Sequence, residues 1–491
     1  MTDSWVNTAE RIGRDLHLEL SGTGGRRAAL IRALRGAVRE GRLAAGTRLP
    51  PYRSLAADLG LARNTVAGAY AELVAEGWLT ARQGSGTRVA DRAVPLRTGG
   101  VPKKPAAHPA RPAAPPAHNL RQGLPDAASF PRADWLAAAR RALNAAPHEA
   151  FGPGDPQGRT ELRQALAAYL TRVRGVRTAP ERIVVCSGVA HAMRLLFGGG
   201  VLRGPLGVEA YGLGFHRSLL AAAGVRTVPL TVDQDGARVG ELASAPGARA
   251  ALLTPAHQFP TGGPLSAPRR TAVVDWARAH DGLLLEDDYD GEFRYDRKPV
   301  GAVQGLDPER VLYLGSVSKS LSPAMRLGWM VLPEHLVGPV LAAKGEREGW
   351  AGVLDQLTLA EFIDSGYYDR HVRRTRQRYR SRRDQLVAAL VARAPHIAPT
   401  GVAAGLHAVL RLPPGTERAT AEAAARRGLA VDALADFRHP DAAGCGADGL
   451  VVGYAAPPDH AYGAALDALC RILPEPGGAV APPQPGGDGC A

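Results

Sequence analysis

The chain has 491 residues, of which 45% are hydrophobic, and its formal net charge at pH 7 is +13. This length and apolar content exclude a disordered chain and predict a large core in more than one domain; the positive charge favours a nucleic-acid partner, although a general excess of arginine would have the same effect. The four cysteines lack C-x-x-C spacing, so we expect neither a metal site nor a disulfide framework. No apolar run approaches 18 residues and the N-terminus lacks a signal pattern, so we expect a soluble cytoplasmic protein without a membrane span.

Three short helices are predicted near the N-terminus. Residues 26–39 carry an apolar stripe at helical spacing, a Pro-Pro pair introduces a second helix, and a third helix opens at Arg63. A helix, a tight turn and a second helix form the arrangement that places the second helix in the DNA major groove, N-terminal end first. By this geometry, Arg63 and Asn64 can read base edges, whereas Thr65 can hold a phosphate.

A two-stranded hairpin with a glycine tip is predicted after the third helix, and such a hairpin is typical of a wing. The segments Thr47-Arg-Leu-Pro50, Arg63-Asn-Thr-Val66, Ala75-Glu-Gly-Trp-Leu79 and Gly84-Ser-Gly-Thr87 together resemble the winged helix of GntR-type transcription regulators. The resemblance implies DNA contacts at Arg53, Arg63, Asn64, Thr65, Gln83 and Gly84. For each of these residues taken alone, a solvated surface position is the alternative.

Composition predicts the domain boundaries. The segment from residue 91 to 118 is rich in proline and alanine and lacks hydrophobic periodicity, which favours a disordered or polyproline-like tether. We therefore expect a winged-helix domain over residues 1–90, a linker over 91–118, a second domain over 119–473 and a disordered tail over 474–491.

Short apolar runs alternate with helical stretches in the second domain. Four of these runs predict parallel, fully buried strands at Ile183–Cys186, Ala250–Leu253, Leu283–Glu286 and Val311–Leu314. This alternation predicts an α/β sheet with helices on both faces and functional residues at the carboxyl ends of the strands.

Polar residues follow the first and third of these runs. Ser187, Gly188, Val189 and Ala190 precede a helix whose first amides can hold a phosphate. Asp287 and Tyr289 follow the third run, where a buried aspartate can pair with a protonated ring nitrogen and a phenol can bond a ring oxygen. A helix cap or a solvated turn is the alternative.

Lys319 follows the fourth run. Only five of the 60 basic residues are lysines, so a lysine at this position indicates that an amine, rather than a guanidinium group, is needed there. Ser316, Ser318 and Arg326 surround it with hydroxyls and a guanidinium group. These groups suit a phosphate that lies beside a reactive amine. A solvated loop lysine is the alternative.

Together these segments resemble fold-type I aminotransferases, which depend on pyridoxal 5′-phosphate (PLP). The segments Gly154-Asp-Pro-Gln-Gly158, His257-Gln-Phe-Pro-Thr-Gly262, Glu286-Asp-Asp-Tyr-Asp290 and Ser316-Val-Ser-Lys319 are similar to MocR-type regulators. That family fuses a GntR-type winged helix to an aminotransferase-like domain. The resemblance implies an α/β large domain of aminotransferase fold type I preceded by a winged helix, and a homodimer whose two heads read two half-sites of an operator.

The resemblance also implies roles at the PLP site. Lys319 would form the Schiff base with PLP, Asp287 would pair with the pyridine nitrogen, and Tyr289 would contact the ring hydroxyl. The phosphate would be held by Ser316, Ser318, Arg326 and the amides of residues 187–190. His257 would lie near the ring.

Two positions near this site depart from the family pattern. The family's Glu-x-Pro-Gly-Tyr reads Glu209-Ala-Tyr-Gly-Leu213, so Leu213 replaces the aromatic side chain that stacks on the ring unless Tyr211 compensates. Ala190-His191 stands where the family often has two glutamines.

Two functions remain open. The favoured one is a DNA-binding transcription regulator that senses PLP or a PLP–amine adduct through its aminotransferase-like domain. The alternative is an active aminotransferase with an accessory DNA-binding domain. Aminotransferases bind the substrate carboxylate with an arginine that is missing from residues 448–454, and Arg438 is the nearest candidate. This loss favours sensing over efficient transamination.

Overall fold

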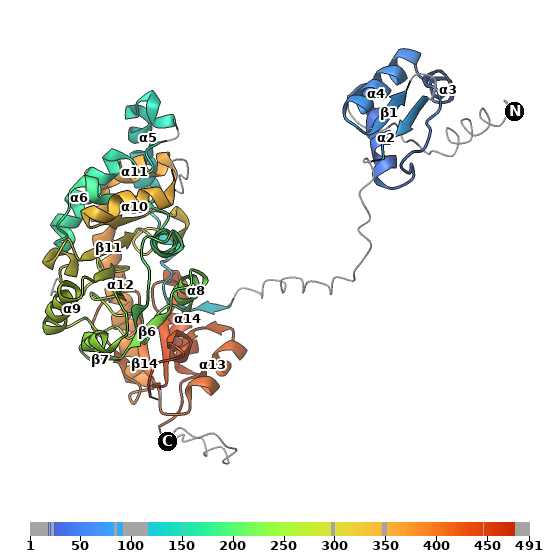
Figure 1. Ribbon diagram of the computed structural model, residues 1–491. Coiled ribbons are helices and arrows are strands. Elements are labelled where there is room, and N and C mark those ends of the chain that lie inside the picture. The colour runs from blue at the N-terminus through green and yellow to red at the C-terminus, as the bar shows by residue number, and fades with distance from the viewer. Residues whose placement is uncertain are drawn as a thin grey trace. The chain divides into compact units, whose positions relative to one another are not determined.

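The computed structural model describes residues 18, 20, 24–82, 86–91, 116–152, 154–295, 300–345, 351–444 and 446–476 (Figure 1). The chain divides into two compact units, residues 1–113 and 114–491. No helix within the described ranges has the length and apolar character needed to cross a membrane.

Within its described residues, the first unit has three helices and a hairpin. Its elements are α2 (Gly25–Arg39), α3 (Tyr52–Asp58), α4 (Arg63–Ala75), β1 (Leu79–Arg82) and β2 (Gly86–Val89). The predicted apolar stripes form one core, in which Leu34, Leu55 and Leu73 from the three helices are buried. β1 and β2 pair antiparallel, so the predicted helices and wing are confirmed.

The second unit is built on a seven-stranded sheet. The strand order is β4 (Ile183–Cys186), β12 (Gly328–Val331), β11 (Val311–Ser316), β10 (Leu283–Asp287), β9 (Ala250–Leu253), β5 (Leu206–Glu209) and β6 (Thr227–Leu230). The four predicted strands are confirmed, and all four run in the same direction. The sheet as a whole is mixed, because β12, which was not predicted, pairs antiparallel with both β11 and β4. Only a short loop joins β11 to β12, and neighbouring strands joined by a short loop must run in opposite directions.

Helices cover both faces of this sheet, as the sequence predicts. Alternate side chains of β11 point to opposite faces, so Tyr313 packs in one apolar cluster and Leu312 in another. The face of Tyr313 is covered by α6 (Thr160–Arg174), α11 (Val353–Asp364) and the start of α12 (Tyr367–Arg393). The face of Leu312 is covered by α7 (Val189–Met193), α8 (Gly214–Ala222) and α10 (Glu334–Lys344). α9 (Ala267–Ala279) packs on Leu284 and Val311.

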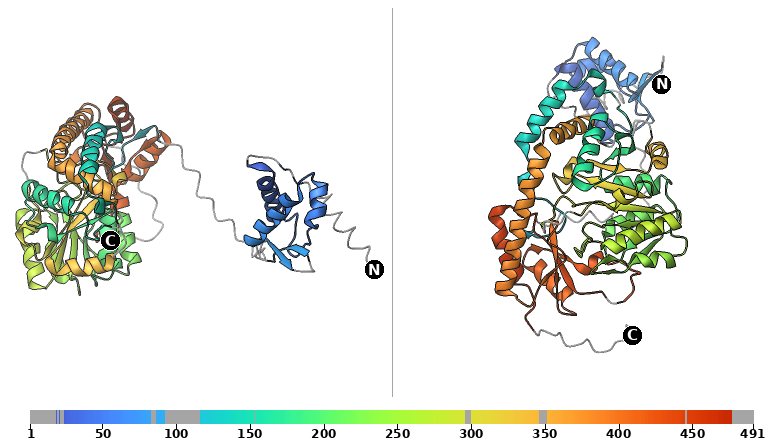
Figure 2. Two further views of the ribbon diagram at one scale, coloured as in Figure 1. Left: turned by 90° about the horizontal axis from the view of Figure 1, so that it is seen from above. Right: turned by 90° about the vertical axis from the view of Figure 1, so that its left-hand side faces the viewer.

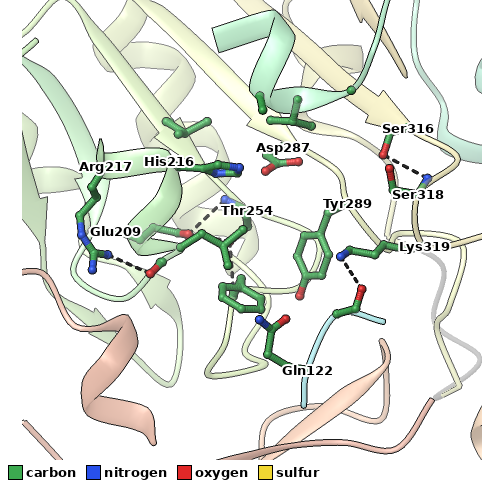
Figure 3. A pocket seen from close by; sticks show the side chains of 18 of the residues that line it. Gln122, Glu209, His216, Arg217, Thr254, Asp287, Tyr289, Ser316, Ser318 and Lys319 are labelled. Atoms are coloured by element: carbon green, nitrogen blue, oxygen red, sulfur yellow. Dashed lines mark hydrogen bonds between the residues drawn. The ribbon is translucent and has the colours of Figure 1, made fainter. Parts of the chain in front are cut away.

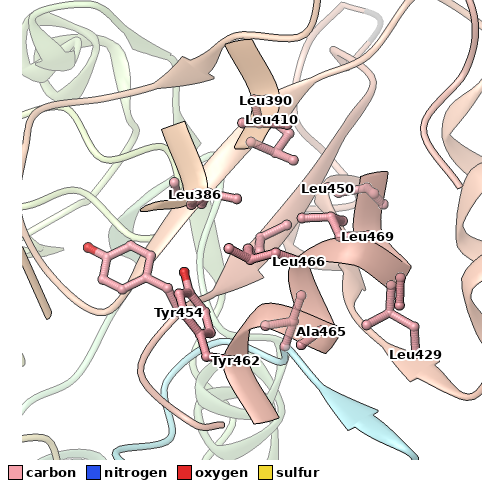
Figure 4. Packing of buried hydrophobic residues seen from close by; sticks show 14 of the residues in the cluster. Leu386, Leu390, Leu410, Leu429, Leu450, Tyr454, Tyr462, Ala465, Leu466 and Leu469 are labelled. Atoms are coloured by element: carbon pink, nitrogen blue, oxygen red, sulfur yellow. The ribbon is translucent and has the colours of Figure 1, made fainter. Parts of the chain in front are cut away.

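A smaller sheet follows toward the C-terminus, in the order β13 (Pro399–Thr400), β14 (His407–Arg411), β17 (Gly449–Gly453) and β16 (Asp432–Ala433). It packs against α13 (Glu417–Arg426), α14 (Asp459–Cys470) and the end of α12 (Figure 4). α12 contributes Val372 to the core of the large sheet and Leu386 to the core of the small sheet, so one long helix connects the two cores (Figure 2).

The first strand of the second unit is fixed by distant sequence. β3 (His118–Asn119) pairs parallel with β15 (Leu429–Ala430), and the amide of Gln122 donates to Asp432. These bonds place the segment after β3 against the C-terminal part of the chain.

The remaining elements are α5 (Arg132–Ala145), β7 (Val232–Asp233), β8 (Gly236–Ala237), the π-helix η4 (Arg194–Gly198) and the 3-10 helices η1 (Ala127–Ser129), η2 (His148–Phe151), η3 (Pro180–Arg182), η5 (Val239–Ser244), η6 (Val303–Leu306), η7 (Pro323–Met325) and η8 (Leu434–Phe437).

Candidate functional site

The parallel strands end at one edge of the large sheet, beside a cavity of about 380 Å³ (Figure 3). Residues that follow different strands therefore meet at this cavity. Its wall includes Lys319 after β11, Asp287 at the end of β10, Thr254 after β9 and Glu209 at the end of β5. This is the place where open α/β sheets bind ligands.

Lys319 extends into this cavity, and its Nζ donates to the carbonyl oxygen of Gly123 over 2.6 Å. Burial lowers the pKa of the Lys319 amine below its usual value, and the charges of Asp290 and Asp287 oppose that shift. A lowered pKa increases the neutral, nucleophilic fraction of a lysine at neutral pH. Lys319 thus lines the cavity wall and is partly buried.

Asp287 is buried at the cavity wall, and its Oδ1 has no hydrogen-bond partner among the described residues. Burial raises the pKa of this carboxyl to about 7, the charge of Asp288 adds to the shift, and Lys319 opposes it. A buried carboxylate oxygen without a partner is costly. The arrangement suits a cationic N–H group of a ligand.

Tyr289 lines the same cavity, and its hydroxyl lies 2.9 Å from Nδ1 of His257. The same Nδ1 lies 2.8 Å from Oδ2 of Asp290, and both residues are buried. His257 is not part of the cavity wall; it contacts Tyr289 from behind. It can therefore orient the phenol without touching a ligand.

The cavity also carries the expected phosphate-binding groups. Gly188, Val189, Ala190, Ser316, Ser318 and Arg326 line it. Nη2 of Arg326 donates to the carbonyl oxygen of Ser187 over 2.5 Å, so Ser187 holds the guanidinium rather than lining the cavity. A Cβ on Gly188 would lie 3.7 Å from Nη2 of Arg326, so the glycine backbone lies close to the guanidinium group.

These residues fit PLP. The cavity combines a reactive amine, a buried carboxylate oxygen without a partner among the described residues, a phenol, and a cluster of hydroxyls, amides and one guanidinium. Each group can bind one part of the cofactor. The amine suits the aldehyde, the carboxylate the ring nitrogen, the phenol the ring hydroxyl, and the cluster the phosphate.

The departure from the family pattern at Leu213 lies at the cavity wall. Tyr211 and Leu213 both line it, and both pack against the apolar cluster that contains Phe259 and Phe437. Arg438, the candidate for carboxylate binding, does not line this cavity, because its Nη2 donates to carbonyl oxygens of Ala442, Ala443 and Gly444. β17, where the arginine is missing, is fully buried.

Several cavity residues were not anticipated from the sequence. They are Gln122 and Gly123 after β3, Glu209 at the end of β5, His216 and Arg217 on α8, and Thr254 and Phe259 after β9. Thr254 Oγ1 donates to Oε2 of Glu209 over 2.5 Å, and burial raises the pKa of Glu209 to about 7. Arg217 donates to three backbone carbonyls, those of Gly212, Phe437 and Arg438. Glu209 is a carboxylate at the end of a buried strand, and Glu286 stands one residue before the end of β10. This position was the local signal that could have predicted Glu209 as a cavity residue.

The candidate DNA-binding residues lie on α3 and α4. Arg53, Arg63 and Asn64 are exposed, whereas Thr65 is partly buried. The hydroxyl of Tyr70 donates to the carbonyl oxygen of Pro50 over 2.9 Å, which fixes α4 against the turn before α3. The wing-tip residues Gln83 and Gly84 lie outside the described residues.

Comparison with known proteins agrees with both units. Residues 27–89 match the family of bacterial regulatory proteins, gntR family, and residues 118–443 match aminotransferase class I and II. An archaeal alanine:glyoxylate aminotransferase has the same fold, with a TM-score of 0.65 and 24% identity over 72% of this chain and 90% of that one. The fold and site thus define a GntR-type winged helix joined to a domain of a PLP-dependent fold family.

Relatives with both units are also found. The probable rhizopine catabolism regulatory protein MocR of Rhizobium meliloti is 36% identical over 375 residues, which cover 73% of this chain and 76% of that protein. The HTH-type pyridoxine biosynthesis transcriptional regulator PdxR of Corynebacterium glutamicum is 33% identical over 426 residues, which cover 87% and 91%. The chain belongs to the MocR-type family of transcription regulators.

Proposed function

We propose that this transcription regulator senses PLP, or an adduct of PLP with an amine, through its second unit. One observation carries the proposal: the amine of Lys319 and a buried oxygen of Asp287, which has no partner in the described part of the chain, line a single cavity after neighbouring strands. The name of the PdxR relative refers to pyridoxine biosynthesis, which is in keeping with this ligand class.

Different residues of the cavity are suited to bind different parts of PLP. PLP supplies an aldehyde and an electron-withdrawing ring when it is bound. Lys319 would provide the amine for that aldehyde, Asp287 would accept the N–H of the ring, and Tyr289 would bond the ring hydroxyl. Ser316, Ser318, Arg326 and the amides of residues 188–190 hold the phosphate.

DNA is bound by the first unit. Arg63 and Asn64 read base edges in the major groove, and Thr65 and Arg53 contact the backbone together with the wing tip at Gln83 and Gly84. The protein acts as a homodimer, so that two winged helices occupy two half-sites. Ligand binding changes DNA affinity only if PLP or its adduct binds one arrangement of the protein more tightly than another.

The test is an absorbance titration of the purified protein with PLP. We expect a visible band that saturates with PLP and disappears in Lys319→Ala. Lys319→Arg keeps the positive charge but cannot condense with the aldehyde, so it also lacks the band. A wild-type protein that shows no band and no PLP affinity at any concentration contradicts the proposal.

An active aminotransferase remains the second candidate, because Lys319, Asp287 and Tyr289 all reach the cavity. The two arginines of the described cavity wall argue against efficient turnover. Arg326 bonds the carbonyl of Ser187 at the phosphate end, and Arg217 already donates to three carbonyls. Repeated conversion of an amino acid and a keto acid by the PLP-loaded protein would favour the enzyme over the sensor.

A further inference from the structure

The long helix α12 carries far more positive than negative charge. Its 27 residues include nine arginines and two aspartates. Its buried side chains, such as Val372 and Leu386, pack against the cores of the two sheets. The helix, orange in the right-hand view of Figure 2, runs along the edge of the second unit. One side of α12 therefore holds the fold together, and the other side faces solvent.

Arginines on the inner side of α12 have acidic partners. Arg382 is buried and pairs with Asp459 over 2.8 Å, and Arg378 pairs with both Asp126 and Asp459. These ion pairs attach α12 to the segment before η1 and to the start of α14. A buried guanidinium needs such a partner, because an uncompensated buried charge is costly. The charge of these two arginines is thus used within the protein.

The outer side of α12 carries a row of exposed arginines without acidic partners. Arg370, Arg373 and Arg380 are the outer row; their spacing of three and seven residues places them on one helix face, over about 15 Å. Arg373 and Arg380 make no hydrogen bond or ion pair with any described residue. The guanidinium of Arg370 lies 4.5 Å from the centroid of the Tyr367 ring. Asp384 is on the same side but pairs with none of the three.

The outer row does not stabilise the helix that carries it. Like charges three residues apart on a helix repel each other, and the first two members of the row have this spacing. Exposed helical arginines elsewhere have acidic partners, such as Arg27 with Glu72 and Arg418 with Glu422. A general excess of arginine over lysine changes the type of cation but does not leave one helix side without paired acids. The row is therefore suited to an anionic partner outside the chain.

DNA is the polyanion that the first unit supplies. Residues 92–115, which connect the described parts of the two units, span at most about 80 Å when fully extended. This length corresponds to about 20–25 base pairs of duplex at 3.4 Å each. Since both units belong to one chain, DNA held by the first unit is present near the second at about millimolar effective concentration. Weak phosphate contacts suffice under these conditions, and the planar fork of arginine suits phosphate oxygens.

We propose that the outer row of α12 binds backbone phosphates of the DNA that flanks the operator. This inference rests on DNA binding by the first unit and adds a second contact, which the proposed function does not include. A row of about 15 Å matches the phosphates of about four successive base pairs on one strand. Contacts of this kind add affinity and salt dependence but do not read sequence.

The test compares two DNA duplexes with the full-length protein. The short duplex is one that the wild-type protein selects from a random pool, trimmed to the minimum that retains specific binding. The long duplex is the same sequence with about 25 base pairs of unrelated sequence on each side, a length that covers the reach of the connecting segment. Affinities are measured by fluorescence anisotropy between 50 and 200 mM salt. The variant of interest is the outer-row variant, Arg370→Ala with Arg373→Ala and Arg380→Ala.

The outer-row variant should differ from wild type on the long duplex alone. Each lost phosphate contact lowers the slope of log K against log salt by about 0.9, so the slope should fall by about 3 for one engaged row. Over the fourfold salt range, the wild-type protein should thus lose about 40-fold more affinity than the variant. On the short duplex, the two proteins should have the same affinity and the same slope.

A matched control removes the same charge from other exposed positions of the second unit. Arg278→Ala, Arg418→Ala and Arg426→Ala together delete three exposed arginines that already pair with Asp307 or Glu422. This control variant has the net charge of the outer-row variant. It should keep the wild-type slope on the long duplex. A control variant that loses as much slope as the outer-row variant would overturn the proposal, because net charge alone would then explain the effect.

The remaining outcomes separate this inference from DNA binding by the first unit. Arg63→Ala should weaken binding to both duplexes, so its effect does not depend on the flanks. Equal slopes for wild type and the outer-row variant on the long duplex, or equal losses on the two duplexes, would overturn the proposal while leaving the first unit as the DNA-binding part. Thermal unfolding should show the outer-row variant to be as stable as wild type, since its substitutions remove only repulsion. A changed oligomeric state in light scattering would also overturn the proposal, because the row would then lie between protein copies.

Discussion

Nζ of Lys319 donates to the carbonyl oxygen of Gly123 over 2.6 Å, although the two residues are 196 positions apart. The bond joins the loop after β11 to the segment that follows β3. Because β3 pairs with β15, the reactive amine is oriented by a backbone that the C-terminal part of the chain holds in place.

We expect Gly123→Ala to weaken PLP binding. The backbone of Gly123 has a φ of +77°, and a Cβ there would lie 3.0 Å from Nζ of Lys319. The methyl group therefore displaces the amine, and the left-handed backbone adds about 1–2 kcal/mol of strain. PLP affinity by absorbance titration and unfolding in urea measure the two effects.

Gly175→Ala is the matched control for that variant. Gly175 ends α6 with a φ of +66°, and a Cβ there would meet nothing within 4 Å. It should lose similar stability while its PLP affinity stays at the wild-type value. Equal PLP affinities for the two variants would show that the contact between Gly123 and Lys319 is irrelevant to binding.

Arg174→Met should strongly destabilise the second unit. Arg174 Nε and Nη2 donate to the two oxygens of Asp288 over 2.7 and 3.0 Å, and both side chains are almost fully buried. Removing one partner leaves an uncompensated buried charge, at a cost of about 3–5 kcal/mol. Arg172→Met breaks the more exposed pair with Asp369 and should cost no more than about 1 kcal/mol in the same urea titration.

The stability of the protein should fall as pH rises from about 5 to 7, in part because of Glu209. Burial raises the pKa of Glu209 from 4.5 to about 7, so the folded state binds more protons than the unfolded state in this range. This contribution is fully present below pH 4.5 and is lost as pH passes 7. Glu209→Gln does not titrate and removes it.

We therefore expect the unfolding free energy of Glu209→Gln, relative to wild type, to increase by about 3 kcal/mol between pH 4.5 and 8. Urea titrations at several pH values measure this difference. Glu149→Gln, at an exposed position on η2, serves as the control and should follow wild type. Parallel pH curves for wild type and Glu209→Gln would refute the assignment.

Arg63→Ala should weaken operator binding by about 1–3 kcal/mol if Arg63 reads a base. Arg63 is exposed on the first turn of α4, where a recognition helix contacts base edges. Arg63→Lys keeps the charge but loses the planar fork, so it should restore a phosphate contact but not base reading. Gel-shift titration at fixed salt distinguishes these cases, and unchanged affinity in Arg63→Ala removes the residue from the interface.

Local patterns sufficed for much of the fold. The helices of the first unit are visible as apolar stripes such as Leu30, Ile31 and Leu34, and β10 and β11 as short runs of large apolar residues. β5 was missed because Gly207 interrupts its apolar run, so Glu209 was not predicted to line the cavity. An apolar run predicts a strand but not the direction in which that strand pairs, so the antiparallel pairing of β12 could not be predicted.

The sequence by itself determined the two-part organisation, the strands that carry the site, and the identities of Lys319, Asp287 and Tyr289, because periodicity and neighbouring residue types are local properties. Only the tertiary structure decided that Gly123 meets Lys319 and that Arg217 is held by backbone carbonyls. These contacts join segments far apart in the chain, and they depend on how the strands are ordered in the sheet, which no short stretch of residues encodes.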